Sequence, residues 1–437
     1  MADTPAPGSR LTRTQRLRAL GPGLLFAGAA IGVSHLVQST RAGALYGFGL
    51  VGVVLVAHAS KYPGLSFGTR YTNATGYSLL EAYRRQGTWA LVAFLVLTVG
   101  TMFTLVAAVS FLTGALLQQL VIRHIAPGLS LQWSAIVVLA IVGALLRGGG
   151  FRWLDRVLKT LLSTLAVLAL GSTLVAATRV DWSTLSLWPP PRALADKAAL
   201  GFVVALAGWM PAPLDISVWN SVWAQAHRSQ RGRRASWAET KFDFNLGFAL
   251  CVVLALCFVV LGAASYHERG IEPAAGGLAF SQQVIGMFTD ALGPWAYPAV
   301  SICAFAVMFS TTLTVVDALP RVLTVMTERF SRPEDGGQSV VDHARSGRYW
   351  SWHAVLVAGT AVVLFAFVEN LRQLVDLATT LSFLTTPVFA WLNHRAILGD
   401  EVEDAFRPSS AMVAFSLSCV VVLAAFSLFF LYFRFVL

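Results

Sequence analysis

A polar stretch near the start of the chain carries side chains that can bind a metal ion or a small polar solute. Residues 32–41 include Gly32, Ser34, His35 and Arg41, within otherwise apolar surroundings. Imidazole is a common ligand of divalent transition metals, and a guanidinium pairs with carboxylates and other anions. We therefore take these four residues as candidate substrate-binding residues. The alternative interpretation of His35 is a hydrogen-bonded histidine that only packs one helix against another.

A second stretch, residues 208–215, supplies the remaining candidate ligands. It reads Gly-Trp-Met-Pro-Ala-Pro-Leu-Asp, and its candidate substrate-binding residues are Gly208, Met210, Ala212 and Asp215. The thioether of Met210 suits soft metals, so Met210 and His35 form a candidate metal-binding pair. Asp215 is either a residue that the dipole of a helix N-terminus stabilises, or a partner of the substrate or of Arg41.

Two prolines in this second stretch predict a broken helix. Pro211 and Pro213 each lack a backbone N–H and each clash with the preceding turn, so a continuous helix is unfavourable there. Inside a membrane, unpaired backbone is tolerated only where it is buried in protein or lines a cavity. Trp209, which lies directly before Met210, is a candidate gate over such a cavity, with ordinary packing between helices as the alternative.

The elements that position these residues are predicted to be transmembrane helices. The chain has 437 residues, of which 56% are hydrophobic and 12% charged, with a mean hydropathy of +0.66. Soluble globular domains carry about 25% charged residues. The composition therefore excludes a cytosolic enzyme, a disordered chain and a coiled coil, and it indicates an all-α polytopic membrane protein whose surface faces the lipid bilayer.

Apolar runs of about 20 residues predict the positions of the membrane spans. Eleven such runs are found, near 19–46, 47–67, 88–121, 131–147, 152–178, 198–226, 243–265, 292–319, 351–369, 371–394 and 409–434. An amphipathic stretch, 77–86, lies between the second and third of them. Lys61 falls within the second run, and we expect its long side chain to extend to the cytoplasmic edge.

The distribution of basic residues predicts the orientation. If the N-terminal tail, 1–18, is cytoplasmic, 23 of the 32 Lys and Arg residues lie on cytoplasmic segments and seven lie on outer ones. This excess favours a cytoplasmic N-terminus and an extracytoplasmic C-terminus, in the inner membrane of a bacterium. Topology thus accounts for the net charge of +10, and no nucleic-acid partner is expected.

The first span is also predicted to be interrupted, because Gly28 and Gly32 precede the polar residues 34–41. The spacing of the two interrupted spans, the first and the sixth, predicts an internal repeat. Each opens a block of five spans: 19–178 forms the first block and 198–394 the second, joined by an outer loop at 179–197. An inner loop and the eleventh span, 395–437, follow. Two blocks of five spans have opposite orientations in the membrane, and such inverted repeats with broken helices are typical of secondary transporters that bind their substrate at the midplane.

Several segments resemble, in matching order, segments of the Nramp family of divalent-metal transporters. They are Gly21–Ile31 and Arg41–Gly47 in the first span, Met210–Pro211 in the sixth, Phe242–Asn245 in the seventh and Ser310–Thr314 in the eighth. The resemblance implies a fold of about 11 helices in a 5+5 inverted repeat, with helices one and six broken, and transport by alternating access.

The chain departs from the family at the residues that bind metal and move protons. The family's first-span Asp-Pro-Gly-Asn corresponds here to residues 32–35, which read Gly-Val-Ser-His, and the family's Met-Pro-His corresponds to Met210, Pro211 and Ala212. The third span, 88–121, contains no carboxylate. Thr379 stands near the place of a tenth-span ligand that is usually Gln, which makes it a further candidate substrate-binding residue.

Three functions are compatible with these observations. The first is a secondary-active transporter that moves a divalent metal through a remodelled site without a resident cofactor. The second is a transporter of a small zwitterionic or organic solute on the same fold, which Arg41 and the missing acids favour. The third is a non-transporting scaffold or sensor. We expect no enzyme, because the eight histidines form no His-Glu-x-x-His pattern and no phosphate-binding loop is present.

Overall fold

The computed structural model describes most of the chain. The described residues are 12, 15–16, 19–148, 151–180, 182, 185–189, 196–231, 235–331, 346–368 and 370–436. Most of the predicted tail at 1–18, and residues 181, 183–184 and 190–195 of the predicted loop at 179–197, therefore lie outside them. All the regular structure within the described residues is helical, as predicted.

The first half of the chain, up to the end of the fifth predicted span, forms ten helical segments. They are α2 (Pro22–Ala30), η1 (Ser34–Ser39), α3 (Thr40–Tyr46), α4 (Val51–Thr75), α5 (Leu79–Gln86), α6 (Thr88–Leu117), η2 (Gln118–Ile122), α7 (Arg123–Ile125), α8 (Leu131–Gly148) and α9 (Phe151–Ala177). The predicted amphipathic stretch at 77–86 is thus the short helix α5.

The second half repeats this order and adds a last helix. Its helices are α10 (Lys197–Trp209), α11 (Ile216–Arg231), α12 (Trp237–Ser265), α13 (Gly277–Leu292), α14 (Ala296–Ser331), α15 (Gly347–Ala366), α16 (Leu371–Ile397) and α17 (Ser410–Phe435), with short 3₁₀ turns at His267–Arg269 and Asp404–Phe406. The sequence prediction did not include α13. It has only 16 residues, which is too short to span a bilayer at about 1.5 Å per residue.

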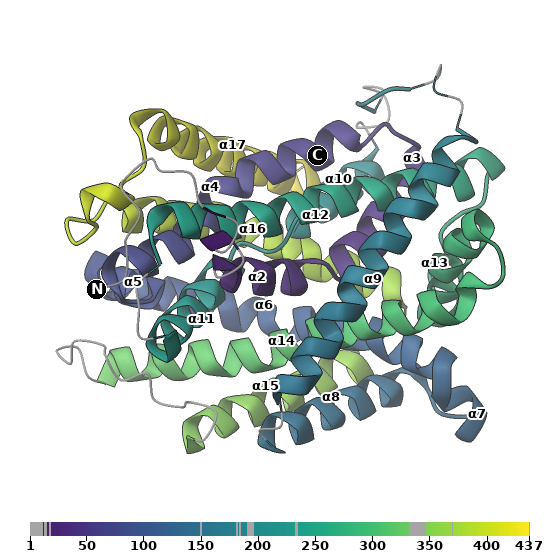
Figure 1. Cartoon of the computed structure of the whole chain (residues 1–437), viewed down its shortest axis with the longest axis horizontal. Helices are drawn as coiled ribbons and strands as arrows, with labels where there is room; N and C mark the ends of the chain where they lie inside the picture. Colours follow the sequence, from purple (N-terminus) through teal and green to yellow (C-terminus); the bar gives the residue numbers. More distant parts are fainter. Residues whose placement is uncertain are drawn as a thin grey trace.

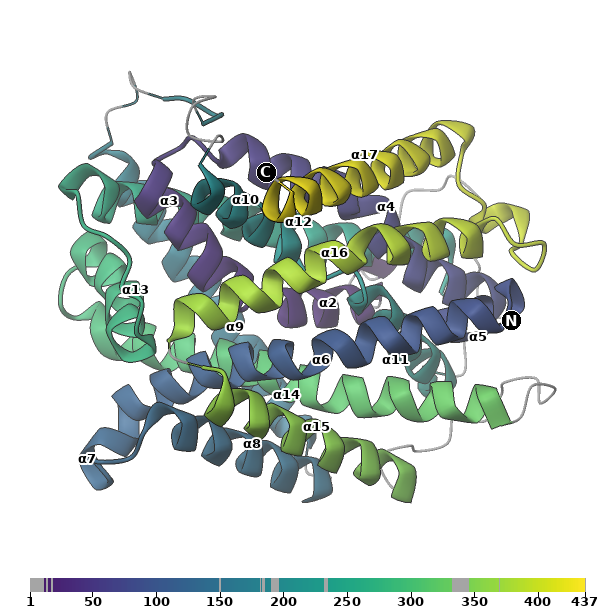
Figure 2. The ribbon, with the colours of Figure 1, turned by 180° about the vertical axis from the view of Figure 1, so that it is seen from behind.

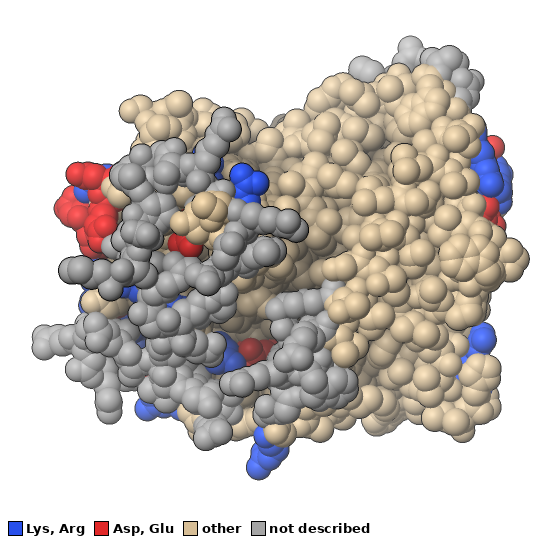
Figure 3. Space-filling model, in the orientation of Figure 1, with Lys and Arg blue, Asp and Glu red and all other residues tan. Residues whose placement is uncertain are grey.

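The helices form a bundle of membrane-spanning length. Among the described residues, eight helices are long and apolar enough to cross a membrane, and the bent pair of α2 with η1 and α3 makes nine. The more polar α4 and the pair α10 and α11 lie at the two other predicted spans, so the total of eleven stays a prediction. Figure 3 shows charged side chains at the two ends of the long axis and few on the face between them, as expected for a protein surrounded by lipid.

The packing of the helices follows the order expected of a repeat. The second span, α4, packs on α11 of the sixth, and the seventh span, α12, packs on α2 and α3 of the first. Likewise α6 packs on α8, and α14 packs on α15. In both ribbon views α2 lies in the middle of the bundle, while α17 lies at one edge and α8 and α15 at the other (Figures 1 and 2). The first and sixth spans are therefore surrounded by the rest of the protein.

The start of the first span is fixed by a side chain of the seventh. The carboxylate of Asp243, in α12, accepts hydrogen bonds from the backbone N–H groups of Gly21 at 2.9 Å and Gly23 at 2.6 Å. These are N–H groups that a helix N-terminus leaves without an internal partner, and a carboxylate also interacts favourably with the helix dipole. Gly23 allows the close approach, because a Cβ there would overlap the Asp243 backbone.

Candidate functional site

The first span breaks directly after α2, where hydroxyl groups take the place of helical N–H groups. The two parts of the span meet at an angle of 51°. The hydroxyl of Thr311, from α14, lies 3.3 Å from the carbonyl of Ile31, and the hydroxyl of Ser34 donates to the carbonyl of Ala30 at 2.8 Å. Gly32 lies against Thr311, where a Cβ would be 3.0 Å from the threonine side chain. The break predicted in this span is thus present, and Gly32 and Ser34 lie at it.

The sixth span breaks where the two prolines predict. The helix α10 ends at Trp209 and α11 begins at Ile216, so residues 210–215 connect them without regular helix. Gly208 lies in the last turn of α10 and touches α16, because a Cβ on it would overlap the carbonyl of Thr379. The missing side chain therefore allows α10 and α16 to pack closely beside the break.

The two breaks face one another. The Ser34 hydroxyl lies 3.3 Å from the carbonyl of Pro211, and the Ser39 hydroxyl lies 4.0 Å from the sulfur of Met210. Between the breaks is a cavity of about 30 Å³, which leaves room for at least one water molecule. The predicted site residues that line it are Ser34, Trp209 and Ala212, and the other lining residues are Ala29, Ala30, Val33, Leu105, Val109, Pro213, Ile216, Trp219, Thr311 and Val315.

The lining of this cavity is mainly aliphatic and aromatic, with few polar groups. Ser34 and Thr311 supply hydroxyls, both of which already donate to backbone carbonyls. The indole N–H of Trp209 donates to the hydroxyl of Ser382 in α16 at 2.8 Å. Trp219 also lines the cavity, and its indole nitrogen has no hydrogen-bond partner in the part of the chain that the structure describes.

The two residues predicted as a metal-binding pair are both buried beside the cavity. His35 and Met210 are each 0% exposed. The Nδ1 atom of His35 lies 2.7 Å from the Ser34 hydroxyl, and its Nε2 atom lies 3.0 Å from the carbonyl of Cys251. His35 therefore links η1 to α12 through its Nε2 atom, and its role as a metal ligand stays a prediction. Among the described residues, the sulfur of Met210 accepts one long hydrogen bond, from the Ser39 hydroxyl.

Arg41 lies further along the first span and pairs with a carboxylate of the tenth. Its Nη1 atom lies 2.6 Å from Oδ1 of Asp376, and its Nη2 atom lies 3.0 Å from Oδ2, so the ion pair is bidentate. The Arg41 side chain is 5% exposed and that of Asp376 34%. The guanidinium also stacks over the ring of Phe202 in α10, 4.7 Å from its centre. The alternative that Asp215 is the partner of Arg41 is therefore wrong.

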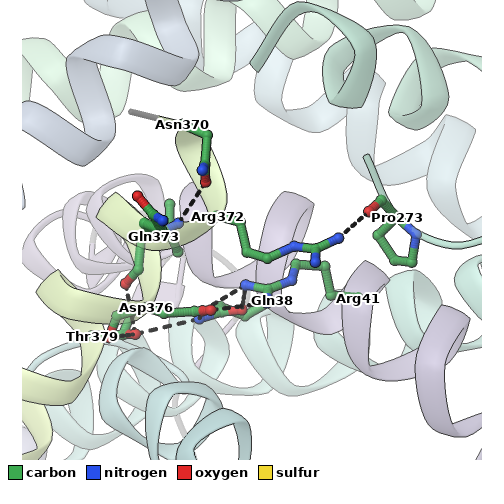
Figure 4. Close-up of polar contacts among 9 residues, drawn as sticks. Gln38, Arg41, Pro273, Asn370, Arg372, Gln373, Asp376 and Thr379 are labelled. Atoms are coloured by element: carbon green, nitrogen blue, oxygen red, sulfur yellow. Dashed lines mark hydrogen bonds and ion pairs between the residues drawn. The ribbon is translucent and has the colours of Figure 1, made fainter. Parts of the chain in front are cut away.

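Gln38 and Thr379 complete this network. The amide of Gln38 donates to Asp376 and to the Thr379 hydroxyl, both at 3.3 Å, and its oxygen accepts from Arg41 at 3.0 Å. Figure 4 shows Arg41 and Asp376 pointing toward one another, whereas the guanidinium of Arg372 points away to the carbonyl of Pro273. The network joins α3 to α16 at the end of the bundle that the charge distribution predicts to be extracytoplasmic.

The predicted site residues thus fall into two groups. Gly32, Ser34, Met210 and Ala212 lie at the facing breaks, with His35, Gly208 and Asp215 next to them, and Arg41 and Thr379 belong to the ion-pair network. The sequence analysis missed Asp376, although it is the only carboxylate in α16. A charge inside a predicted span is itself a sign of a functional or paired residue.

The described side chains contain no conventional metal site. No group of three or more His, Cys, Asp or Glu residues that could hold a metal ion occurs among them. The donor groups at the breaks are backbone carbonyls, hydroxyls, the Met210 sulfur and the single carboxylate of Asp215.

The fold and the facing breaks define a class of protein, the helical membrane transporters with broken helices in an inverted repeat. The natural resistance-associated macrophage protein-like family model matches residues 23–432. The chain belongs to this family, called Nramp, and the resemblance seen in the sequence is confirmed. It is an integral membrane protein of a transporter family.

Individual relatives agree with this assignment. An uncharacterized protein of Pasteurella multocida is 32% identical over 430 residues, which cover 95% of this chain and 92% of that protein. The divalent metal cation transporter MntH of Levilactobacillus brevis is 21% identical over 90% of this chain and 84% of its own. The manganese transporter of Eremococcus coleocola superposes with a TM-score of 0.67 at 14% identity, covering 95% of this chain and 86% of that one, and so shares the fold.

Proposed function

We propose that this protein is a secondary-active transporter that moves a divalent metal ion by alternating access, without enzymatic activity and without a resident cofactor. The observation that carries the proposal is the position and size of the cavity. It lies where the two broken spans of an Nramp-family fold face one another, and its volume of about 30 Å³ suits a single ion. The naming of a relative as a divalent metal cation transporter supports the same substrate class.

The ligands that we propose for the ion differ from those of a site built mainly from carboxylates. Backbone carbonyls freed by the breaks, together with the thioether of Met210, form a nearly uncharged donor set in which the sulfur is the one soft ligand. Thioethers favour transition metals, whereas Mg²⁺ and Ca²⁺ prefer oxygen ligands, usually with carboxylates. The transporter is accordingly selective for ions such as Mn²⁺, Fe²⁺, Co²⁺ or Zn²⁺ over Mg²⁺.

We further propose that the N-terminus is cytoplasmic and the C-terminus extracytoplasmic, in a bacterial inner membrane. This orientation rests on the excess of Lys and Arg in the segments that it makes cytoplasmic.

Uptake by purified protein in liposomes tests the metal and the role of Met210. We expect the wild-type protein to take up at least one of Mn²⁺, Fe²⁺, Co²⁺ and Zn²⁺, and Met210→Ala to lower that uptake at least several-fold. Met287→Ala is the matched control, because Met287 in α13 is equally buried at 0% exposure and its loss leaves a similar cavity. Uptake of none of these ions, or equal losses in the two variants, would contradict the proposal.

A second candidate substrate is a small organic or zwitterionic solute, and one observation favours it. Trp219 lines a cavity whose walls are mainly aliphatic and aromatic, and its indole nitrogen has no partner among the described residues. A solute with an apolar body and an oxygen acceptor would suit such a lining. Uptake of a panel of labelled amino acids and other small solutes in the same liposomes separates the two candidates.

A further inference from the structure

Lys61 is a buried cation that the proposed transport site does not use. It lies within α4 and is 1% exposed. The expectation that its side chain reaches the cytoplasmic edge is wrong. Instead its ammonium group donates to the carbonyl of Gly208 at 2.6 Å and to the carbonyl of Ala212 at 3.0 Å. Two buried backbone carbonyls thus replace the water molecules that normally accept hydrogen bonds from a lysine ammonium group.

Both acceptors are products of the break in the sixth span. In a continuous helix the carbonyl of Gly208 would accept from the N–H of Ala212, four residues later. Because α10 ends at Trp209, the Gly208 carbonyl lies in the last turn of that helix and lacks this partner, and the Ala212 carbonyl lies in the non-helical connection at 210–215. A helix C-terminus also carries the negative end of the helix dipole, which attracts cations. The break therefore creates a place that favours positive charge.

A carboxylate adds to this negative potential. Asp215, at the far side of the same break, is 4% exposed and interacts electrostatically with Lys61. Its Oδ1 atom has no hydrogen-bond partner among the described residues. Two backbone carbonyls with a nearby carboxylate are the kind of oxygen ligands that bind hard cations.

We propose that Lys61 is the resident cation of the broken sixth span. Its ammonium group occupies a site of backbone carbonyls that would otherwise take a small monovalent cation, so this break needs no exchangeable Na⁺ or K⁺. Lys61 is thus a positioning residue that holds residues 208–212 in place. The consequence for uptake rests on the proposed transport function, whereas the consequence for ion binding and stability does not.

Thermal unfolding of the purified protein in different salts tests this directly. For the wild type we expect the same Tm in NaCl, LiCl, KCl and choline chloride. For Lys61→Ala we expect a lower Tm in choline chloride and a rise of a few degrees in NaCl or LiCl, because an ion that binds only the folded state stabilises it. Propylammonium, which matches the atoms removed, should also raise the Tm of Lys61→Ala and not that of the wild type.

Two further variants complete the experiment. In Lys61→Ala/Asp215→Asn the stabilisation by Na⁺ should shrink, since the carboxylate is neutralised. If Lys61→Ala does not fold, Lys61→Met serves instead, because it keeps the length of the side chain and removes only the charge. A Lys61→Met protein as stable as the wild type would overturn the proposal, as would a folded Lys61→Ala protein that no cation stabilises, or a wild type already stabilised by Na⁺ over choline.

Uptake provides an independent readout. The wild-type protein should transport its substrate equally well with Na⁺, K⁺ or choline as the only monovalent cation outside, and a strict requirement for Na⁺ would contradict the role of Lys61. Failure to transport any metal would instead count against the proposed function and leave the thermal measurements valid.

Discussion

Asp376→Asn is expected to destabilise the protein by about 2–3 kcal/mol and to impair uptake. The substitution removes the charge that neutralises Arg41, whose side chain is 5% exposed and cannot reach water without rearrangement. Removing one partner of a buried ion pair costs about 3–5 kcal/mol, and we reduce this because Asp376 is 34% exposed and partly screened by solvent. The Tm measured by thermal unfolding should fall accordingly.

The double variant Arg41→Gln/Asp376→Asn is the control for this interpretation. Neutral residues at both positions leave no uncompensated charge, and they can still hydrogen-bond to Gln38. We therefore expect the double variant to regain most of the lost stability, which gives a favourable coupling between the two positions in a double-mutant cycle. Additive losses from the two single variants would show that the ion pair does not act as a unit.

The ion pair also has a consequence for the transport cycle. It joins α3, in the second half of the broken first span, to α16, and Gln38 and Thr379 strengthen the same connection (Figure 4). Any movement that separates these two helices must break a bidentate interaction. Asp376→Asn therefore tests stability and, through uptake, the contribution of this connection to alternating access.

Much of the fold was predictable from local features of the sequence. Apolar runs located the helices to within a few residues in most cases, for example 371–394 for α16 at Leu371–Ile397. The break in the sixth span follows from Pro211 and Pro213, because proline disrupts a helix whatever surrounds it. The first span contains no comparable proline at its break, which was predicted from Gly28, Gly32 and the polar residues 34–41 that follow them.

The partners of the buried charges were not predictable in the same way. Arg41 and Asp376 are 335 residues apart in the chain, and spacing within one helix says nothing about which helix lies opposite. Lys61 was expected at the membrane surface because the rule for long basic side chains assumes that water is the only acceptor. The carbonyls of Gly208 and Ala212 are available as acceptors only because the sixth span is broken beside Lys61.

Gly208→Ala is expected to destabilise the protein by about 1–3 kcal/mol, the usual cost of forcing an extra methyl group into a packed interior. A Cβ at position 208 would overlap the carbonyl of Thr379 and would lie 3.3 Å from the Cβ of Phe383, so α10 and α16 would have to separate. Backbone cannot move aside as a flexible side chain can. The shift would also displace the Gly208 carbonyl from Lys61, so we expect uptake to fall together with the Tm.

Gly201→Ala, in the same helix, provides a control with the opposite sign. A Cβ at position 201 would meet no atom within 4 Å, and alanine is more favourable than glycine inside a helix by about 0.5–1 kcal/mol. Gly201→Ala should therefore leave the Tm unchanged or raise it slightly, with normal uptake. If both variants behave alike, the close contact between α10 and α16 is not what requires glycine at position 208. A fall in Tm and uptake that occurs in Gly208→Ala and not in Gly201→Ala would mean that the chain needs this contact to hold the carbonyl end of α10 against Lys61.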